Sequence, residues 1–321
     1  AHEGCWIPLR MSKPIDDKPL ISVLLPVFNG MPYLPESINS LLDQSEQRFI
    51  IIAVDDGSTD GSVDYLRSVR DPRLRLITAN HSGLVGTLNK ALGEAGTRYV
   101  ARMDADDICS NTRFEEQLRF LENHSDIVLV GCSADHIGER GGEGSWPIKM
   151  PTDHQDIVRA MLRRNSAIIH PTIMARLAAL QSAGEYSQKA WPAEDYELFL
   201  RLGLHGKLAN LSERLYSIRL HGSSITSSSI IFGQRQYEKV RREYISMYSI
   251  SGSKKSECGR AFEPLRSVSL TFDAWSVFLY RRGLKCMVNG EGGRGRLFLM
   301  SSAFLSPRRT ITYMRRRLTE V

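Results

Sequence analysis

Short apolar runs alternate with amphipathic stretches along the first 130 residues of the chain. The apolar runs are too short for helices and end at turn-forming or acidic residues; they cover 20–27, 48–54, 73–78, 98–103 and 126–132. The intervening stretches repeat apolar residues at helical spacing and cover 31–44, 63–69, 84–94 and 112–123. This alternation predicts βαβ units, and therefore an α/β fold whose mostly parallel sheet carries helices on both faces.

The regular alternation ends at a glycine-rich loop over 138–144. Beyond it the pattern predicts a helix over 154–163, a short strand over 167–169, a helix over 193–204, and a final strand pair over 207–211 and 215–220. A serine-rich stretch over 223–229 marks a boundary. We therefore expect an N-terminal leader over 1–19, a main domain over 20–229 with halves 20–132 and 133–229, and a basic helical region over 230–321.

The composition is that of a globular protein. The 321-residue chain has 42% apolar and 24% charged residues, which excludes a wholly disordered or fibrous protein. Its apolar runs fall well short of the about 18 residues that a membrane-spanning helix needs. Five cysteines, an odd number without CxxC spacing, favour reduced thiols in the cytoplasm over a disulfide or zinc framework. The first ten residues lack the layout of a secretory signal, and Met11 is a candidate natural start.

Two acidic clusters follow predicted strands, Asp55-Asp56 after the second and Asp104, Asp106 and Asp107 after the fourth. The carboxyl ends of parallel strands meet at one edge of a sheet, where α/β proteins bind ligands. The carboxylates of Asp104 and Asp106 could both turn toward one hard cation such as Mg²⁺ or Mn²⁺. Alternatively, this loop is a solvated acidic turn that caps the next helix. Asp56 could likewise accept hydrogen bonds from a nucleoside base or ribose, or serve only in a turn and a helix cap.

A third group of candidate residues lies in the second half of the main domain. Glu194 and Asp195 open a predicted helix, where the helix dipole by itself favours acidic residues. In the functional interpretation Asp195 is a general base that deprotonates an acceptor hydroxyl in concert with bond formation, and Glu194 orients the base or binds the acceptor. His221 ends a predicted strand and is either a structural residue or part of a metal or phosphate site.

These motifs follow one another in a recognisable order. They are Pro26-Val27-Phe28-Asn29, Asp55-Asp56-Gly57-Ser58-Thr59-Asp60, Gly83 with Leu88-Asn89-x-Ala91, Ala101-Arg102-Met103-Asp104-Ala105-Asp106-Asp107, then Glu194-Asp195 and His221. In this order and spacing the chain resembles the family 2 glycosyltransferases of the GT-A fold over residues 20–226. The resemblance implies a nucleoside diphosphate sugar bound by the half 20–132, an acceptor bound by the half 133–229, Mg²⁺ or Mn²⁺ as cofactor, and transfer with inversion at the anomeric carbon.

The resemblance also assigns roles by position. To donor binding it assigns Pro26, Phe28, Asn29, Asp55, Asp56, Gly83, Asn89, Arg102 and Asp104. The remaining roles are metal ligand for Asp106 with Asp104 and His221, base for Asp195, and acceptor contact for Trp191 and Glu194. The chain departs from the family after Gly83, where Leu84-Val85-Gly86-Thr87 lacks the basic residue often found there. We therefore expect the diphosphate to depend on the cation, His221 or another basic side chain.

The sequence thus predicts a metal-dependent, inverting glycosyltransferase of the hexosyltransferase type. Its donor is expected to be a UDP- or dTDP-sugar, and its acceptor a hydroxyl of a glycan or lipid-linked molecule in bacterial surface polysaccharide or lipopolysaccharide synthesis. A sugar-nucleotide nucleotidyltransferase is the alternative enzyme, but it usually carries a glycine-rich basic loop where this chain has Asn29-Gly30-Met31-Pro32. A catalytically inactive sugar- or lipid-binding subunit is the second alternative, and the presence of Asp106 and Asp195 argues against it. The oligomeric state is left open.

Charge is distributed unevenly along the chain, whose net charge is +6. Residues 1–229 hold 24 Lys and Arg against 29 Asp and Glu, whereas residues 230–321 hold 18 against 7. The basic region is either a helical appendage that packs on the main domain or a second subunit, or a contact with an anionic membrane surface. No nucleic-acid-binding module is recognisable, so no nucleic-acid partner is expected. The predicted location is cytoplasmic, with a peripheral position on the inner face of the cell membrane under the second interpretation.

Overall fold

The computed structural model describes residues 18–139, 146–163, 167–221, 230–250 and 292–305, together with positions 279 and 286. Its strands are β1 (Ile21–Val27), β2 (Phe49–Asp55), β3 (Leu74–Thr78), β4 (Tyr99–Arg102), β5 (Ile108–Cys109), β6 (Ile127–Ile137), β7 (Trp146–Ile148), β8 (Met174–Arg176) and β9 (Lys207–Arg219). Its α-helices are α1 (Leu34–Leu42), α2 (Ser62–Ser68), α3 (Gly83–Gly93), α4 (Arg113–Asn123), α5 (His154–Leu162), α6 (Leu177–Ala183), α7 (Glu194–His205), α8 (Ile230–Ile250) and α11 (Gly292–Leu305). Two 3₁₀ turns are η1 (His170–Thr172) and η2 (Gln188–Ala190).

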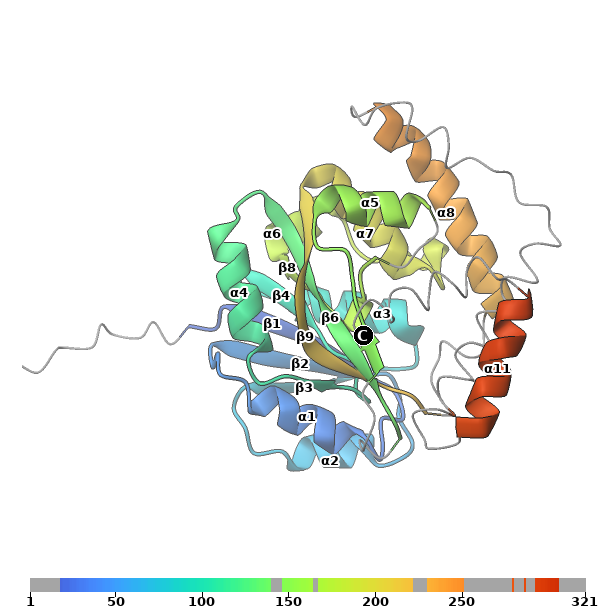
Figure 1. Ribbon diagram of the computed structural model, residues 1–321. Helices are drawn as coiled ribbons and strands as arrows, with labels where there is room; N and C mark the ends of the chain where they lie inside the picture. Colours follow the sequence, from blue (N-terminus) through green and yellow to red (C-terminus); the bar gives the residue numbers. More distant parts are fainter. Residues whose placement is uncertain are drawn as a thin grey trace, which may run out of the picture.

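One sheet runs through the middle of the molecule in the order β3-β2-β1-β4-β8-β6-β9-β5, with β7 paired to β6 (Figure 1). Strands β1 to β4 pair in parallel, and β6 pairs in parallel with β9. Strand β8 lies between β4 and β6 and is antiparallel to both. Most paired residues lie in parallel ladders, so the α/β fold predicted from the alternating pattern is confirmed.

The sheet is covered on both faces, as its apolar strands require. Along β1, Val23 and Leu25 pack against α1, α2 and α4 on one face. Leu24, between them, points to the opposite face of the sheet. There it belongs to a second hydrophobic core, which includes residues of α3, α5, α6, α7 and α8. Because successive strand residues point to opposite faces, a strand buried on both sides reads as a continuous apolar run.

The strand order brings the carboxyl ends of β1, β2, β4, β6 and β9 to one edge of the sheet. Strand β8 runs the other way, so the η1 turn that precedes it lies at this same edge. Both acidic clusters predicted at strand ends therefore emerge on the same side of the sheet, which is where parallel sheets bind ligands.

Two predictions for the second half of the domain are wrong. Residues 167–169 are irregular, and the strand that pairs with β4 begins only at Met174, after the η1 turn that contains Pro171. The expected strand pair over 207–211 and 215–220 is one continuous strand, β9. Register shifts in the β6–β9 ladder accommodate the polar residues between the two apolar runs, so they do not form a turn.

The basic region is helical where it is described, over α8 and α11. Helix α8 packs on α7 and contributes Val240, Ile245 and Tyr248 to the second core. The predicted leader up to residue 17, most of the glycine-rich loop and the serine-rich stretch over 223–229 lie outside the described residues. In the part of the chain that the structure describes, no helix is both long and apolar enough to cross a membrane.

A buried arginine connects helix α4 to the strands that carry the site. Arg113 is fully buried, and its guanidinium donates to the carbonyl oxygens of Arg102 (2.8 Å) and Ile173 (3.2 Å). Its Nε donates to Gln117, whose amide in turn donates to the carbonyl oxygens of Val130 and Thr172. These bonds satisfy buried carbonyl groups where the β4, β6 and β8 ladders end, and the Ile173 carbonyl oxygen accepts a second bond from the Arg102 N–H (3.1 Å).

Replacing this arginine should therefore destabilise the whole domain. Arg113→Ala leaves the buried Arg102 carbonyl group without its donor, removes one of two donors to the Ile173 carbonyl group and opens a cavity, so we expect a loss of roughly 3 kcal/mol or more in unfolding free energy. Denaturant unfolding measures this loss. Arg119→Ala on the same helix is the control, because Arg119 is exposed and its one ion pair among the described residues is with Glu116 at the surface. Equal stability of the two variants would contradict the role given to Arg113.

Candidate active site

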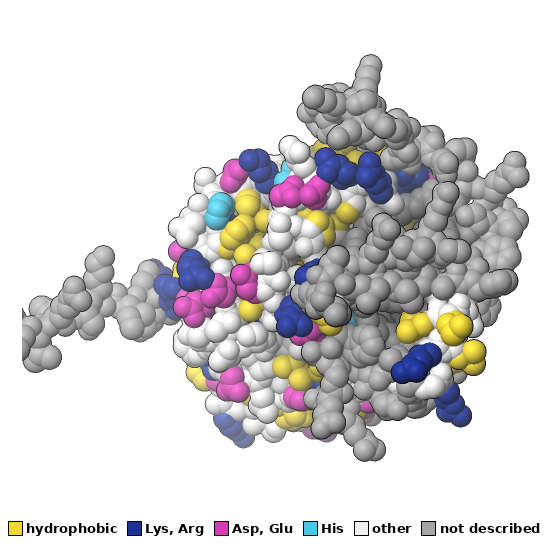
Figure 2. Space-filling view, in the orientation of Figure 1, with side chains coloured by type: hydrophobic (Ala, Val, Ile, Leu, Met, Phe, Trp, Pro, Cys, Tyr) yellow, Lys and Arg dark blue, Asp and Glu magenta, His cyan; other side chains and the backbone are white. Residues whose placement is uncertain are grey.

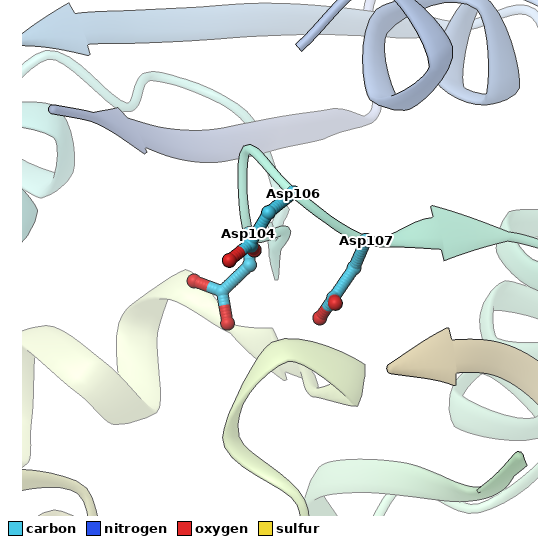
Figure 3. A group of neighbouring side chains, drawn as sticks. All are labelled: Asp104, Asp106 and Asp107. Atoms are coloured by element: carbon cyan, nitrogen blue, oxygen red, sulfur yellow. The ribbon is translucent and has the colours of Figure 1, made fainter. Parts of the chain in front are cut away.

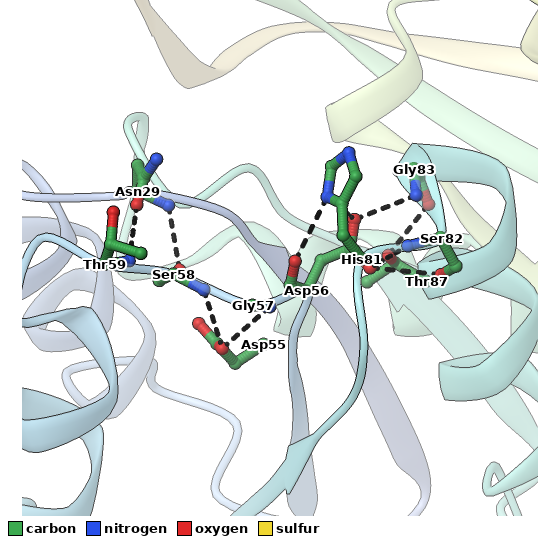
Figure 4. Close-up of polar contacts among 10 residues, drawn as sticks. All are labelled: Asn29, Asp55, Asp56, Gly57, Ser58, Thr59, His81, Ser82, Gly83 and Thr87. Carbon is green, nitrogen blue, oxygen red and sulfur yellow. Dashed lines mark hydrogen bonds and ion pairs between the residues drawn. The ribbon is translucent and has the colours of Figure 1, made fainter.

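The loops after β1 and β2 are held together by the polar residues of the first two motifs (Figure 4). The backbone N–H of Asn29 donates to Ser58 Oγ (2.9 Å), and the backbone N–H of Thr59 donates to the side-chain Oδ1 of Asn29 (2.8 Å). Asn29 has φ of 50°, a left-handed conformation that asparagine tolerates better than most residues. This turn leaves the neighbouring Phe28 half exposed, with its ring centroid 4.6 Å from that of His81.

The two acids after β2 have different surroundings. Asp55 is buried, and its Oδ2 accepts hydrogen bonds from the backbone of Gly57 and Ser58, both at 3.1 Å. Its Oδ1 is a buried acceptor without a hydrogen-bond partner among the described residues. One carboxylate oxygen of Asp55 therefore shapes the turn, and the other can still accept a bond.

Asp56 fixes the start of helix α3. Its Oδ1 accepts from the Ser82 N–H (2.7 Å) and hydroxyl (3.1 Å), and its Oδ2 accepts from the Gly83 N–H (2.9 Å) and lies 3.0 Å from His81 Nδ1. Gly83 has φ of +75°, which a side chain would disfavour. A nucleoside base would therefore share the Asp56 carboxylate with donors from this helix start.

Asn89, on α3, holds a segment far from it in the sequence. Its side-chain amide donates to the Tyr186 carbonyl oxygen and accepts from the Tyr186 N–H, both at 2.9 Å. The Tyr186 hydroxyl lies 2.9 Å from His170 Nε2, in a buried pair. Sequence reasoning missed this pair, because the two residues lie in irregular segments without a periodic signal.

The loop between β4 and β5 gathers three carboxylates. Asp104, Asp106 and Asp107 project to the same side (Figure 3), and each offers an oxygen within 4.8 Å of the others. Buried Arg102 holds Asp104 with two contacts, of 2.8 and 2.5 Å. Such an acidic group suits a hard divalent cation, because carboxylate oxygens are its preferred ligands.

The end of β9 closes around this loop from the other half of the sheet. His221 Nε2 lies 2.7 Å from Asp106 Oδ2, although the two residues are 115 positions apart. The buried Arg219 donates from its backbone N–H to Asp107 (2.8 Å) and from its Nε to the Asp106 carbonyl oxygen (2.8 Å). The sequence analysis counted Asp107 in the acidic cluster without giving it a role, and it did not include Arg219; the available signal was the position of Arg219 two residues before His221.

The convergence of carboxylates is electrostatically costly in the absence of a cation. Burial raises the pKa of Asp107 well above its ordinary value, and the charges of Asp106 and Asp104 raise it further. Burial also raises the pKa of Asp104, against the lowering effect of Arg102. A bound cation would relieve this repulsion, so the donor set fits a divalent metal.

The two acids that open α7 interact electrostatically with Arg102, and Asp195 also with Asp104 of this cluster. The charge of Asp195 contributes to the raised pKa of Asp104, and Arg102 lowers the pKa of Asp195, which burial raises. Glu194 is buried, and its Oε2 has no hydrogen-bond partner in the described chain. Burial, and then the neighbouring Asp195, raise the Glu194 pKa to about 8. Trp191, just before α7, packs against the second core.

The fold and motifs agree with comparisons to known proteins. The family model Glycosyl transferase family 2 matches residues 22–181. An uncharacterized glycosyltransferase of Haemophilus influenzae is 33% identical over 250 residues, which cover 73% of this chain and 76% of that protein. The amylovoran biosynthesis glycosyltransferase AmsE of Erwinia amylovora is 30% identical, covering 72% of this chain and 85% of AmsE.

Solved structures show the same fold. S. aureus TarS 1–349, in complex with UDP-GlcNAc, has a TM-score of 0.58 at 18% identity, covering 89% of this chain and 91% of that one. The mannosyltransferase PcManGT of Pyrobaculum calidifontis has a TM-score of 0.52 at 14% identity, covering 89% and 86%. At these identities the likeness concerns the fold alone, whereas the curated relatives share the sequence over most of their own length. The chain therefore belongs to the family 2 glycosyltransferases.

Proposed function

We propose that this glycosyltransferase moves a hexose from a nucleoside diphosphate sugar, with UDP- and dTDP-sugars favoured, to a hydroxyl of a glycan or lipid-linked acceptor. The observation that carries the proposal is the cluster of Asp104, Asp106 and Asp107, in which Asp104 pairs with buried Arg102 and interacts electrostatically with Asp195. The TarS structure with UDP-GlcNAc supports the donor class. Relatives named for amylovoran and, in Bacillus subtilis TuaG, for teichuronic acid biosynthesis support a role in surface polysaccharide synthesis.

The donor end of the site is assigned to the β1 and β2 loops. Pro26 and the half-exposed ring of Phe28 offer an apolar surface for the nucleoside, with His81 beside it. Asp55 Oδ1, which has no partner among the described residues, can accept a hydrogen bond from an N–H of the nucleoside base or an O–H of the ribose. Asp56 holds the start of α3 in place. Arg102 belongs to the same donor side through its hold on Asp104.

The metal is assigned to Asp106 with His221, and to Asp104 and Asp107 next to them. The structure of PcManGT in complex with GDP-Man and Mn²⁺ supports a divalent ion in this fold. Such an ion supplies Lewis-acid stabilisation of the negative charge on the departing diphosphate. Arg219 would keep the loop in shape for such an ion, because it holds the backbone of Asp106 and the carboxylate of Asp107.

Asp195 is assigned as the base. Inversion requires that the acceptor hydroxyl attack the anomeric carbon from the face opposite the leaving diphosphate, and its proton must pass to a nearby acceptor as the new C–O bond forms. Asp195 lies on α7, and its charge acts on Asp104 of the β4–β5 loop that carries the acidic cluster. Glu194 and Trp191 are assigned to the acceptor side of the same helix start.

A peripheral position at an anionic membrane surface is part of the proposal, because a lipid-linked acceptor would lie there. Helix α11 exposes Leu297 and Met300 beside Arg294 and Arg296. Figure 2 shows hydrophobic and basic side chains side by side where α11 lies in Figure 1. Exposed apolar groups flanked by arginines are typical of segments that contact the lipid headgroup region.

Donor binding should depend on the metal and on Asp106. In a thermal-shift panel of nucleotide sugars with Mn²⁺, we expect one donor to raise the melting temperature by a few °C, because a ligand bound to the native state stabilises it. Omitting Mn²⁺ or introducing Asp106→Asn should abolish the shift. Asp64→Asn is the control, since Asp64 on α2 is 88% exposed. A full Mn²⁺-dependent shift in Asp106→Asn would rule out Asp106 as the main ligand.

Turnover should depend on the carboxylate of Asp195. Asp195→Asn keeps the size of the side chain but cannot accept the proton, so we expect turnover to fall by about 10²- to 10⁴-fold. The donor-induced thermal shift should be retained, because Asp195 is assigned to the acceptor side. Near-normal turnover of the variant would refute the base assignment. Donor binding by the wild type without any transfer would favour the inactive subunit.

Stability should depend on pH through Glu194. Its pKa is raised from an ordinary 4.5 to about 8, so the folded state binds this proton more tightly than the unfolded state. The stability contribution of this group is therefore lost as pH rises from about 4.5 to about 8. Because Glu194→Gln cannot ionise, its melting temperature should improve relative to the wild type between pH 5 and pH 8. A difference that does not change with pH would contradict the raised pKa.

A further inference from the structure

Helix α8 is held against α7 by a row of tyrosine hydroxyl groups. Three tyrosines lie on one face of α8, spaced seven and four residues apart, as the helical repeat requires. Their hydrogen bonds are from Tyr237 to Asp195 Oδ1 (3.3 Å), from Tyr244 to Glu197 Oε1 (2.6 Å), and from Tyr248 to the Leu200 carbonyl oxygen (2.7 Å). The row follows α7 from its first turn into its second.

The rest of the contact holds α8 firmly in this position. Arg241 is buried and donates to the Leu162 carbonyl oxygen at the end of α5 (3.0 Å), and it also pairs with buried Glu238 (2.8 Å). Near its other end, the Tyr248 hydroxyl occupies the space left by the missing side chain of Gly203 on α7. Helix α8 is therefore an integral part of the second core rather than a loosely attached segment.

Tyr237 differs from the other two tyrosines in its partner. Asp195 Oδ1 accepts from the Tyr237 hydroxyl and from the Tyr196 backbone N–H (2.6 Å). Among the described residues, no donor contacts Asp195 Oδ2. The Tyr237 ring also packs against the ring of Tyr196, with 5.1 Å between centroids, which limits the positions its hydroxyl can take. The two donors thus fix one carboxylate oxygen and leave the other without a donor among the described residues.

Several charged or titratable groups act on this carboxylate. Glu194 on α7 and Asp104 after β4 are acidic neighbours, Arg102 at the end of β4 is a basic one, and Tyr186 precedes α7. Burial raises the pKa of Asp195, whereas the Tyr196 N–H, Arg102 and the Tyr237 hydroxyl lower it. A hydrogen bond donated to the ionised form stabilises that form, which is the form a base needs.

We propose that Tyr237 is a positioning residue for Asp195, with its hydroxyl holding Oδ1 so that Oδ2 meets the acceptor hydroxyl. The inference rests on the proposed function, in which Asp195 is the base. It assigns part of the active site to α8, which lies well beyond the segment 22–181 that the family model matches.

The matched pair Tyr237→Phe and Tyr244→Phe tests the inference. Each variant removes one hydroxyl from the same face of α8, but only the first removes a contact with Asp195. The titration of Asp195 is followed by ¹³C NMR of the full chain labelled at aspartate side-chain carboxyl carbons. The Asp195 resonance is identified as the one missing from the spectrum of Asp195→Asn. The measurement needs no substrate.

In Tyr237→Phe we expect the titration midpoint of Asp195 to rise by about half to one pH unit, the equivalent of one hydrogen bond. In Tyr244→Phe the midpoint should stay at the wild-type value while the melting temperature falls, because that hydroxyl only joins the helices. An unchanged midpoint in Tyr237→Phe, or an equal rise in both variants, would overturn the inference.

Turnover separates this inference from the proposed function. With the donor found in the thermal-shift panel, loss of turnover in Asp195→Asn and an acid limb moved to higher pH in Tyr237→Phe support both. Loss of turnover in Asp195→Asn with a wild-type pH profile in Tyr237→Phe overturns the role of Tyr237 alone. Normal turnover in Asp195→Asn refutes the assignment of Asp195 as the base, whatever the NMR titration shows.

Discussion

The site depends on holding several carboxylates close together at the edge of a buried sheet. Asp104, Asp106 and Asp107 repel one another, and burial makes their charges more costly still. Two buried arginines offset this cost: Arg102 pairs with Asp104, and Arg219 holds the loop that carries the other two acids. The protein thus maintains a strongly acidic loop in a fixed shape, which is the condition for binding a hard cation and an anionic donor together.

The motif residues divide into those that build the loops and those that face the site. The side chains of Asn29, Asp56 and Asn89 accept hydrogen bonds from backbone N–H groups of neighbouring segments. These bonds fix the geometry of the loops. Phe28 is half exposed and Asp106 is partly exposed, as ligand contacts require. A polar residue in a family motif is therefore not by itself a ligand contact, because a loop at a strand end needs partners for its own N–H and C=O groups.

The second half of the domain completes the site through long-range contacts. Strand β9 carries His221 to Asp106, and helix α7 places Asp195 near Asp104. Helix α8 then reaches the same acid through Tyr237. The candidate base is thus supported from α7, from the end of β4 and from α8, three segments that are far apart in the sequence. Such support from rigid elements fixes a side chain more closely than a surface loop could.

The sequence by itself determined the parallel half of the fold and the position of both acidic clusters. The spacing of apolar residues predicts which face of a single helix or strand is buried. The turn residues after Val27, Asp55 and Arg102 mark where each strand ends. Only the tertiary structure decided that β9 is continuous, that His170 meets Tyr186, and that Tyr237 reaches Asp195. These contacts join segments whose local patterns are independent of one another, so packing of the whole chain, rather than periodicity along it, brings them together.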